Sequence, residues 1–406
     1  MIKLKVLMLA PEPFFEPRGT PISVYQRLWA LSSLGYRIDL LTYHVGTDIE
    51  IPNVRIIRTP KIPFIRNVKI GPSWVKLLLD FFMVFYAIIL LLKGNYDVIH
   101  SHEEASFFAM VLARLFRTTH LYDMHSSLPK QLENFKIGNW LILIKLFDAL
   151  ERWVLKTCDA VITIDKDLAN HVYRIDPDVP QLVIENLPIR TGSFASTSDD
   201  LFQKCDALQQ TGCLPIVYTG TFESYQGLEL LLESIPIIKQ VHQQAYFILV
   251  GGQPHQIEQL RTIVRKHQLE ADICFIGMVP LEDAVNYLNI AQILVSPRTE
   301  GTSVPLKIYS YLHSGKPIVA TRLPAHTQVL DDTIAFLVEP TKEALADGII
   351  CLLNNPELGQ RLGRKARQIA QEHYSMDGYV TNVAQIYAQL ELVTESGKGQ
   401  LCSLEL

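Results

Sequence analysis

The residue types of the stretch from Ser296 to Thr321, and the order in which they occur, suit the binding of a phosphate group. A polar loop containing Gly301 follows an apolar run, and Pro305 then fits the first turn of a helix, where its missing N–H is not needed. The unpaired N–H groups and the positive dipole end of that turn attract an anion, and Lys307 adds a full charge. Gly315 ends the helix before another apolar run. We therefore predict a strand, loop, helix and strand that form half of a nucleotide-binding sheet.

This stretch resembles the nucleotide-sugar loop of the retaining glycosyltransferases of family 4, whose two Rossmann-like α/β domains face a cleft in the GT-B fold. In the commonest form of that family, a Glu-Gly pair is followed on the helix by a second Glu, and the two carboxylates hold the sugar and the ribose. Glu300 matches the first carboxylate, but Ser310 stands in the place of the second, with nine residues between them. A family variant with a Gly-Thr-x-x-Pro-Leu-Lys helix start, matched by residues 301–307, has this longer spacing. Ser310 can still make a hydrogen bond to the ribose.

The resemblance places further donor-binding residues on the loops that follow predicted strands. They are Gly19 and Thr20 in the first half, and Gly220, Thr221, Gln226, Gly251, Gly252, Gly277, Met278, Val279, Arg298, Gly301, Thr302 and Ser303 in the second. Many family members have an Arg in the place of Thr221 and a Lys in the place of Gln226, and these two grip the diphosphate. Their absence here implies that Lys307, Arg298 and the backbone amides of 301–303 carry more of the phosphate charge. For Gly19 the alternative is that it only makes a turn.

Two histidines follow predicted strands, at the edge where α/β sheets gather their ligands. His102 precedes Glu103, and His125 follows the run that contains Asp123. By resemblance, His125 stands where the family has a cleft histidine that contacts the donor sugar or supports charge at the reaction centre. His102 and Glu103 are weaker candidates for the acceptor side. For His102, Glu103 and Asp123 the alternative is a role in capping or in core hydrogen bonds.

The sequence gives no support for a metal site or for another cofactor. Asp165-Lys166-Asp167 has the spelling of a metal-binding D-x-D motif, but it lies between a strand and a helical segment, where an Asp is expected as a helix cap. The six cysteines have no C-x-x-C spacing, which argues against a disulfide scaffold and a zinc site. A reducing cytosol is the simplest compartment.

The chain of 406 residues is long for a single core, and the repeated alternation of strands and helices predicts two domains. The net charge of −5 gives no case for nucleic-acid binding. The apolar run before Pro11 is too short for a secretion signal, so we predict that it forms the first strand. The predicted parts are 1–189, an acceptor-side domain; 190–213, a linker; 214–373, a nucleotide-sugar-binding domain; 374–393, a helix crossing back to the first domain; and 394–406, a disordered tail.

Residues 51–93 differ in composition from the rest of the first domain. Residues 51–79 contain six basic residues and no acidic one, with Trp74 near their end, and Asp80 then precedes a twelve-residue apolar run, 81–92. As a helix, that run would be ~18 Å long, short of the ~30 Å hydrocarbon core of a bilayer. We expect its outer face to dock on an anionic membrane surface. The alternative is a helix packed inside the protein.

The leading hypothesis from these observations is a retaining, metal-independent hexosyltransferase in which His125, Glu300 and Lys307 are the candidate catalytic residues. It would move a sugar from a nucleotide-diphosphate sugar to a hydroxyl of a lipid-linked or cell-surface glycan precursor, in the cytoplasm at the inner face of the membrane. A helix N-terminus and a lysine would stabilise the departing diphosphate. The alternatives are a sugar-nucleotide epimerase of the same fold and a non-catalytic, sugar-nucleotide-binding subunit at the membrane.

Overall fold

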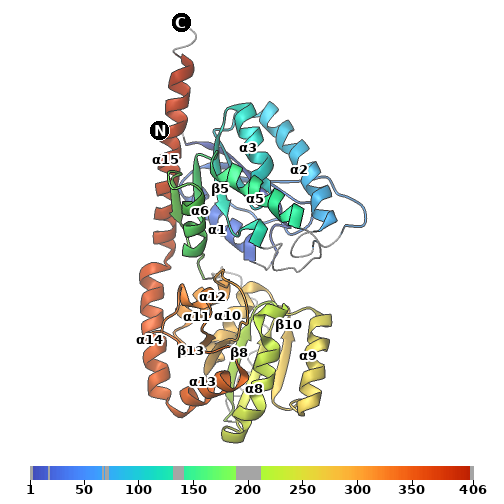
Figure 1. Ribbon diagram of the computed structural model, residues 1–406, viewed down its shortest axis with the longest axis vertical. Helices are drawn as coiled ribbons and strands as arrows, with labels where there is room; N and C mark the ends of the chain where they lie inside the picture. Colours follow the sequence, from blue (N-terminus) through green and yellow to red (C-terminus); the bar gives the residue numbers. More distant parts are fainter. Residues whose placement is uncertain are drawn as a thin grey trace. The chain divides into compact units, whose positions relative to one another are not determined.

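The computed structural model describes residues 3–16, 19–65, 68, 73–130, 141–188 and 212–402. The chain forms two compact units, one of Met1–Asn186 with Met376–Leu406 and the other of Leu187–Ser375 (Figure 1). The predicted linker, 190–213, lies almost entirely outside the described residues. Each unit is an α/β sandwich around a parallel sheet, as the sequence predicts.

The first unit contains a seven-stranded parallel sheet in the order β3-β2-β1-β4-β5-β6-β7. Its strands are β1 (Lys5–Ala10), β2 (Arg37–Thr42), β3 (Val54–Arg58), β4 (Val98–His102), β5 (Thr119–Met124), β6 (Ala160–Thr163) and β7 (Gln181–Val183). Its helices are α1 (Gly19–Ser33), α2 (Trp74–Lys93), α3 (Ala105–Phe116), α5 (Leu141–Leu155), α6 (Lys166–Ile175) and α15 (Met376–Cys402). Helices α2 and α3 share one hydrophobic core with β1, β2 and β4, while α1 packs against α15.

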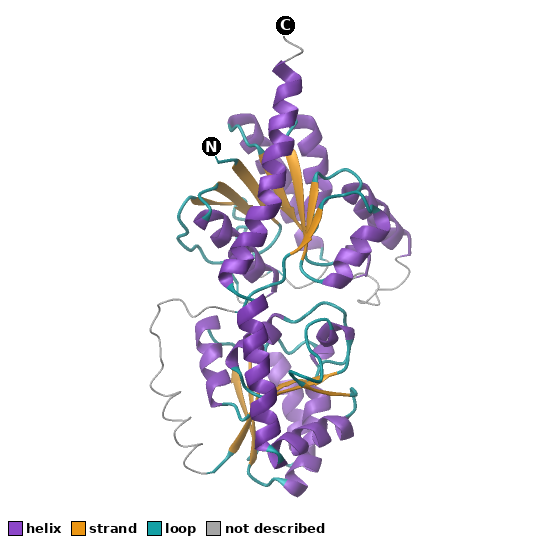
Figure 2. Cartoon of the chain, turned by 90° about the vertical axis from the view of Figure 1, so that its left-hand side faces the viewer, coloured by secondary structure: helices purple, strands orange, loops and turns teal. Residues whose placement is uncertain are grey.

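The second unit contains a six-stranded parallel sheet in the order β10-β9-β8-β11-β12-β13. Its strands are β8 (Leu214–Thr219), β9 (Ala245–Val250), β10 (Ile273–Gly277), β11 (Ile293–Ser296), β12 (Ile318–Thr321) and β13 (Phe336–Val338). Its helices are the 3₁₀ turn η1 (Ser224–Gln226), α8 (Leu228–Val241), α9 (Pro254–His267), α10 (Leu281–Ile290), α11 (Leu306–Ser314), α12 (Pro324–Thr327), α13 (Lys342–Asn354) and α14 (Pro356–His373). Figure 2 shows the strands of both sheets between layers of helices.

The order of the strands explains where a ligand can bind in each unit. In the first sheet the chain runs outward from β1 to β3 and then returns to β4 on the other side of β1. The second sheet reverses in the same way between β8 and β11. At such a reversal the loops after the two neighbouring strands diverge and leave room at the carboxyl edge of the sheet. The candidate residues follow β4 and β5 in the first unit and β8, β9, β10 and β11 in the second.

Helix α15 overturns the prediction of a disordered tail from residue 394. The helix continues to Cys402, and the side chain of Thr394 is buried and hydrogen-bonded to Thr119, with 3.0 Å between the two hydroxyl oxygens. The prediction followed from the position of the segment at the end of the chain, where disorder is common. A helix that is already anchored along one face extends at little cost, because only nucleation is strongly unfavourable. Residues 403–406 lie outside the described part of the chain.

Helix α2 is longer than the apolar run that predicted it. Ser73 accepts a hydrogen bond from the backbone N–H of Lys76, at 3.3 Å, and starts a helix of 20 residues. At about 30 Å, this helix is long and apolar enough to cross a membrane, so the predicted exclusion by length is wrong. One of its faces, however, is buried in the core of the first unit through Leu79, Met83 and Ala87. We interpret α2 as a layer helix of the sandwich.

The basic residues of the segment 51–79 are less free than the sequence suggests. Acidic residues from outside the segment pair with three of them: Arg55 with Asp39 and Arg58 with Asp48, both at 2.7 Å, and Lys76 with Glu104 at 3.0 Å. The prediction of six unopposed charges is therefore wrong, because it considered only the acids within the segment. Lys61 is exposed, and Arg66 and Lys69 lie outside the described residues.

Candidate active site

Three loops of the second unit meet at the carboxyl edge of its sheet, and glycines allow them to approach closely. A Cβ atom on Gly227 would lie 1.9 Å from the carbonyl oxygen of Pro297, and one on Gly251 would lie 1.9 Å from that of Gly220. Both glycines have positive φ, +73° and +117°. Any other residue at these positions would meet both backbone strain and a steric overlap. These contacts join the loops after β8, β9 and β11.

Lys307 projects into the meeting point of these loops from the first turn of α11. Its Nζ lies 3.0 Å from Oε1 of Gln226 and 3.8 Å from the centre of the Tyr218 ring. The side chain is buried, and burial, together with the nearby charge of Arg298, lowers the pKa of Lys307 well below its usual value. No carboxylate among the described residues forms an ion pair with Lys307. A buried lysine without a counter-charge favours an anionic ligand, because only a nearby anion stabilises the protonated form that burial disfavours.

Arg298 shapes the loop that leads to α11. Its Nη1 donates a hydrogen bond to the carbonyl oxygen of Ser303 at 2.7 Å, and its guanidinium lies over the ring of Tyr225. Gly301 has a φ of +108°, and a Cβ there would lie 3.2 Å from Nη2 of Arg298. Within the described chain, the buried Nε of Arg298 has no hydrogen-bond partner. Burial lowers the pKa of Arg298, and the residue contributes a second cation without a carboxylate partner beside Lys307.

Most of the predicted donor residues lie along this edge. Gly251 donates its N–H to the carbonyl oxygen of Gly277 at 2.7 Å, which joins the loops after β9 and β10, and Met278 is exposed just beyond. The other predicted residues of this unit occupy the same loops or the helix that follows: Gly220, Thr221, Gly252, Val279, Glu300, Thr302, Ser303 and Ser310. Glu300 and Thr302 are exposed, and Ser310 is buried one turn beyond Lys307 on α11.

Two tyrosines that the sequence analysis missed support this edge. Tyr218 donates its hydroxyl to the carbonyl oxygen of Thr221 at 2.6 Å and places its ring beneath Lys307. Tyr311, on α11, accepts a hydrogen bond from the backbone N–H of Thr219 at 2.9 Å and fixes the helix against β8. Both tyrosines lie inside apolar runs of the sequence, so their pattern was that of ordinary core residues.

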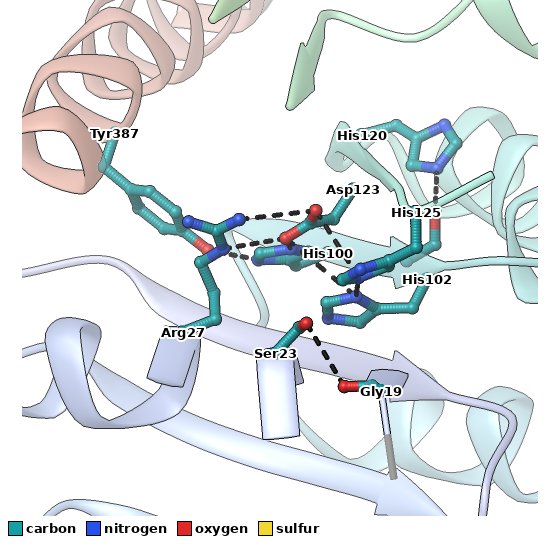
Figure 3. A network of polar contacts seen from close by, with 10 residues as sticks. Gly19, Ser23, Arg27, His100, His102, His120, Asp123, His125 and Tyr387 are labelled. Carbon is teal, nitrogen blue, oxygen red and sulfur yellow. Dashed lines mark hydrogen bonds and ion pairs between the residues drawn. The ribbon is translucent and has the colours of Figure 1, made fainter. Parts of the chain in front are cut away.

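In the first unit, a buried polar cluster contains the candidate residues His102, Asp123 and His125 (Figure 3). Asp123, at the end of β5, accepts hydrogen bonds from Nε of Arg27 at 2.7 Å and from Nε2 of His100 at 3.2 Å. Nδ1 of His102 lies 2.9 Å from Nε2 of His125, which lies 3.6 Å from Oδ1 of Asp123. The sequence thus correctly placed His102, Asp123 and His125 at one edge, but it gave no sign of Arg27.

The charges of this cluster are balanced within it. Burial would raise the pKa of Asp123, but Arg27 and the histidines outweigh burial and hold it well below its usual range. Burial lowers the pKa of His125 to about 4 and that of His102 well below its usual value, with Asp123 acting in the opposite direction. At neutral pH the cluster therefore contains one ion pair and neutral imidazole rings.

The cluster fits a hydrogen-bond network better than a metal ion. The ligand atoms of His100, His102 and Asp123 lie within 4.8 Å of one another, which is close enough for a shared cation. The rings of His100 and His102 are stacked, however, with centres 4.7 Å apart and planes at 19°, so their in-plane lone pairs do not converge. Arg27 also occupies the carboxylate of Asp123. A metal ion at this place would lie close to the guanidinium of Arg27, and the two positive charges would repel each other.

The remaining candidates lie around the cluster. Glu103 has a φ of 46° and accepts a hydrogen bond from Ser126 at 2.9 Å, and burial, with Glu104, raises its pKa to about 8. Gly19 begins α1, with Thr20 next to it, and a Cβ on Gly19 would meet no described atom within 4 Å. The geometry therefore does not require a glycine at this turn. Asp165 caps α6 by accepting the N–H of Leu168 at 2.9 Å, as predicted.

Each of the two units matches a known family of glycosyltransferase domains. The family model described as "Glycosyltransferase Family 4" matches residues 17–186, and that described as "Glycosyl transferases group 1" matches residues 210–369. The chain is 22% identical to phosphatidyl-myo-inositol mannosyltransferase of Mycobacterium tuberculosis, over 97% of this chain and 98% of that protein. It is 21% identical to a glycogen synthase of the same organism, over 72% of this chain and 68% of that protein.

Solved structures share the fold of both units. Sucrose-phosphate synthase from Thermosynechococcus elongatus superposes with a TM-score of 0.76 at 19% identity, covering 96% of this chain and 100% of that one. HepE of Anabaena, solved with UDP and glucose, superposes with a TM-score of 0.72 at 16% identity, covering 95% and 99%. This likeness shows the GT-B fold, and the two family matches show that the chain belongs to glycosyltransferase family 4, whose members use a nucleotide sugar as donor.

Proposed function

We propose that this protein is a retaining, metal-independent hexosyltransferase that transfers a sugar from a nucleotide-diphosphate sugar to a hydroxyl of a membrane-bound acceptor. The single observation that carries the donor part is the buried Lys307, which lies in the first turn of α11, near Arg298, and lacks a carboxylate partner among the described residues. These groups would neutralise the diphosphate as the bond between sugar and phosphate breaks. Stabilisation of a leaving group of this kind requires no protein nucleophile.

The other candidate residues would contact the sugar or the nucleotide. Glu300 would accept hydrogen bonds from hydroxyls of the donor sugar, and the glycine loops would admit the nucleotide close to the backbone. His125 would orient the sugar against the incoming hydroxyl. The mannosyltransferase relative carries a membrane lipid in its name, and HepE was solved with UDP and glucose. Both facts support a nucleotide sugar and a lipid-linked acceptor for this chain.

The outer face of α2 supports the membrane part of the proposal. Trp74, Phe81, Phe85 and Leu92 are 80%, 68%, 56% and 71% exposed, and their spacing keeps them on the side of the helix opposite to the buried one. The two charges in its first turns, Lys76 and Asp80, are directed inward to Glu104 and Tyr43. An uncharged apolar stripe of this size fits the interfacial region of a bilayer, in the plane of the membrane.

A transfer assay tests the donor part. Purified protein is incubated with UDP-, GDP- and ADP-sugars and membrane lipid extract, with and without EDTA, and release of the nucleoside diphosphate is measured. We expect release from at least one donor, unaffected by EDTA. Loss of activity in EDTA with recovery in Mn²⁺ would contradict the metal-independent mechanism.

Flotation with liposomes tests the membrane part separately. We expect the wild type to float with liposomes containing phosphatidylglycerol, and the Phe81→Ser, Phe85→Ser double variant to remain at the bottom of the gradient. Tyr173→Ser is the matched control, because Tyr173 is an aromatic residue 60% exposed on another helix of the same unit, α6. Equal flotation of the double variant and the control would contradict docking through α2.

A further inference from the structure

The ring of His125 uses only one of its two nitrogens in contacts with the described residues. Nε2 lies 2.9 Å from Nδ1 of His102 and 3.6 Å from Oδ1 of Asp123, and every described polar contact of the ring involves this atom. The side chain is 5% exposed. Nδ1 is therefore the nitrogen that remains for a ligand.

The hydrogen bond between His102 and His125 contains one proton, which belongs to one ring or the other. If His125 donated it, neutral His102 would carry its own proton on Nε2, which is buried and has no hydrogen-bond partner within the described chain. Buried N–H groups without an acceptor are rarer in proteins than buried acceptors without a donor. We therefore assign the proton to Nδ1 of His102, which donates to Nε2 of His125. Neutral His125 must then carry its proton on Nδ1.

Asp123 faces both histidines and does not reverse this assignment. Its Oδ1 lies 3.6 Å from Nε2 of His125, and its Oδ2 lies 3.9 Å from Nδ1 of His102. Because the two distances are similar, the carboxylate attracts a proton on either nitrogen to a similar degree. The unpaired Nε2 of His102 then decides which ring donates.

Residues from two helices keep Asp123 from turning toward His125. Arg27, on α1, binds one carboxylate oxygen at 2.7 Å, and Nε2 of His100 donates to the same oxygen at 3.2 Å. His100 in turn accepts a hydrogen bond on Nδ1 from the hydroxyl of Tyr387, on α15, at 2.8 Å. Arg27, His100 and Asp123 are 1% exposed or less. The carboxylate is thus held by fixed groups, as Figure 3 shows.

We propose that His102, Asp123, Arg27 and Tyr387 are positioning residues for His125 and present its Nδ1–H as a hydrogen-bond donor to an oxygen atom of the sugar substrate. This inference rests on the proposed function and deepens it, because it names the atom of His125 that meets the substrate and the group it recognises. Hydroxyl, ring and phosphate oxygens all accept such a bond.

The position of the proton is measured without any reaction. The full-length protein is labelled with ¹⁵N-histidine, and long-range ¹H–¹⁵N spectra are recorded at pH 7 for the wild type and for His125→Gln, which identifies the signals of His125. We expect Nδ1 of His125 to be protonated and Nε2 to be unprotonated. The reverse pattern would overturn the proposal, even if the protein proved to be an active transferase.

Two substitutions of His125 provide an independent test in the transfer assay. The amide nitrogen of Asn falls near the place of Nδ1 and that of Gln near the place of Nε2. We expect His125→Asn to keep a kcat/KM at least about tenfold higher than His125→Gln, because only Asn can replace the donor that meets the substrate. Equal or inverted values would overturn the proposal. If no nucleotide sugar is turned over by the wild type, the proposed function fails, while the spectra still test the proton position.

Tyr387→Phe tests the positioning role. It removes the hydroxyl that binds His100, and we expect kcat to fall with little change in KM. The matched control is Tyr36→Phe, because Tyr36 packs against Tyr387 at 4.9 Å and its hydroxyl binds Glu391, also on α15, without contacting the histidines. Equal effects of the two substitutions on kcat would show that Tyr387 acts only through the packing of α15.

Discussion

Nζ of Lys307 lies 3.0 Å from Oε1 of Gln226, so that residues 81 positions apart in the chain form one buried contact at the edge of the second sheet. An amide oxygen can accept a hydrogen bond from the ammonium, but it cannot balance its charge. Family resemblance places a second cation where Gln226 stands. Lys307, which approaches from the first turn of α11, therefore supplies the charge at this point of the site.

Replacement of Lys307 with Met should abolish the charge while keeping most of the volume. We expect turnover to fall by ~10²–10³, the typical effect of losing an electrostatic contact that forms chiefly in the transition state. The thermal midpoint should not fall, because a buried cation without a carboxylate partner opposes folding. Lys342→Met, on the exposed first turn of α13, is the control. Normal turnover of Lys307→Met in a folded protein would refute the assignment of the site.

Glu300→Ala should reduce turnover without unfolding the protein. Glu300 is exposed in the loop before α11, so its carboxylate contributes little to the folded state. Steady-state kinetics over a range of donor concentrations and a thermal melt are the two measurements. A normal kcat/KM would remove Glu300 from the sugar-binding residues.

Gly251→Ala should damage the second unit more than backbone strain alone explains. Both Gly251 and Gly212 have positive φ, but an added Cβ would overlap the carbonyl of Gly220 only at Gly251. Strain alone, in Gly212→Ala, is expected to cost about 1 kcal/mol or somewhat more. Urea unfolding followed by circular dichroism should show a clearly larger loss for Gly251→Ala. Equal losses would show that the loops after β8 and β9 can separate without penalty.

Removal of Arg27 should destabilise the first unit strongly. Arg27 and Asp123 form a fully buried ion pair at 2.7 Å. Arg27→Ala would leave the carboxylate without its partner, and loss of one partner of a buried pair costs about 3–5 kcal/mol. The double substitution Arg27→Met, Asp123→Leu should be markedly more stable than Arg27→Ala. A double variant as unstable as the single one would mean that packing, not the orphaned charge, decides the loss.

Acid should weaken the fold over a definite pH range because of the buried histidines. Burial lowers the pKa of His125 from 6.5 to about 4. Between these values the unfolded chain binds more protons than the folded one, so stability falls as the pH decreases from 6.5 toward 4. Thermal melts across this range should show the fall, and His125→Gln should lessen it. A melting temperature that does not change between pH 6.5 and 4 would contradict the neutral state of the buried rings.

Local sequence signals predicted the part of the site that lies on one stretch of chain. The order of Gly301, Pro305 and Lys307 predicted the loop and the start of α11, and Gly315 ends that helix with a φ of 71°, as expected of a glycine cap. His102 and His125 lie close together because they stand at the ends of two neighbouring strands of one parallel sheet. In each case the determining residues are neighbours in the sequence or follow from the strand order.

Contacts between distant segments could not be predicted in this way. Arg27 is separated from Asp123 by 96 positions, and Tyr387 from His100 by 287, with no spacing or composition to connect them. The same limit explains the error about the basic residues of 51–79, because their partners Asp39 and Glu104 lie outside this segment. The length of α2 was underestimated for a local reason, because Ser73 starts the helix well before the apolar run.

Binding of nucleoside diphosphates to the wild type and to Lys307→Met, measured by isothermal titration calorimetry at one ionic strength, tests whether Lys307 binds the diphosphate of the donor. We expect that at least one of UDP, GDP and ADP binds the wild type, and that Lys307→Met weakens this binding at least about tenfold while Lys342→Met leaves it unchanged. Binding of equal strength to the wild type and Lys307→Met, or no binding of any of the three to the wild type, would contradict this role of Lys307.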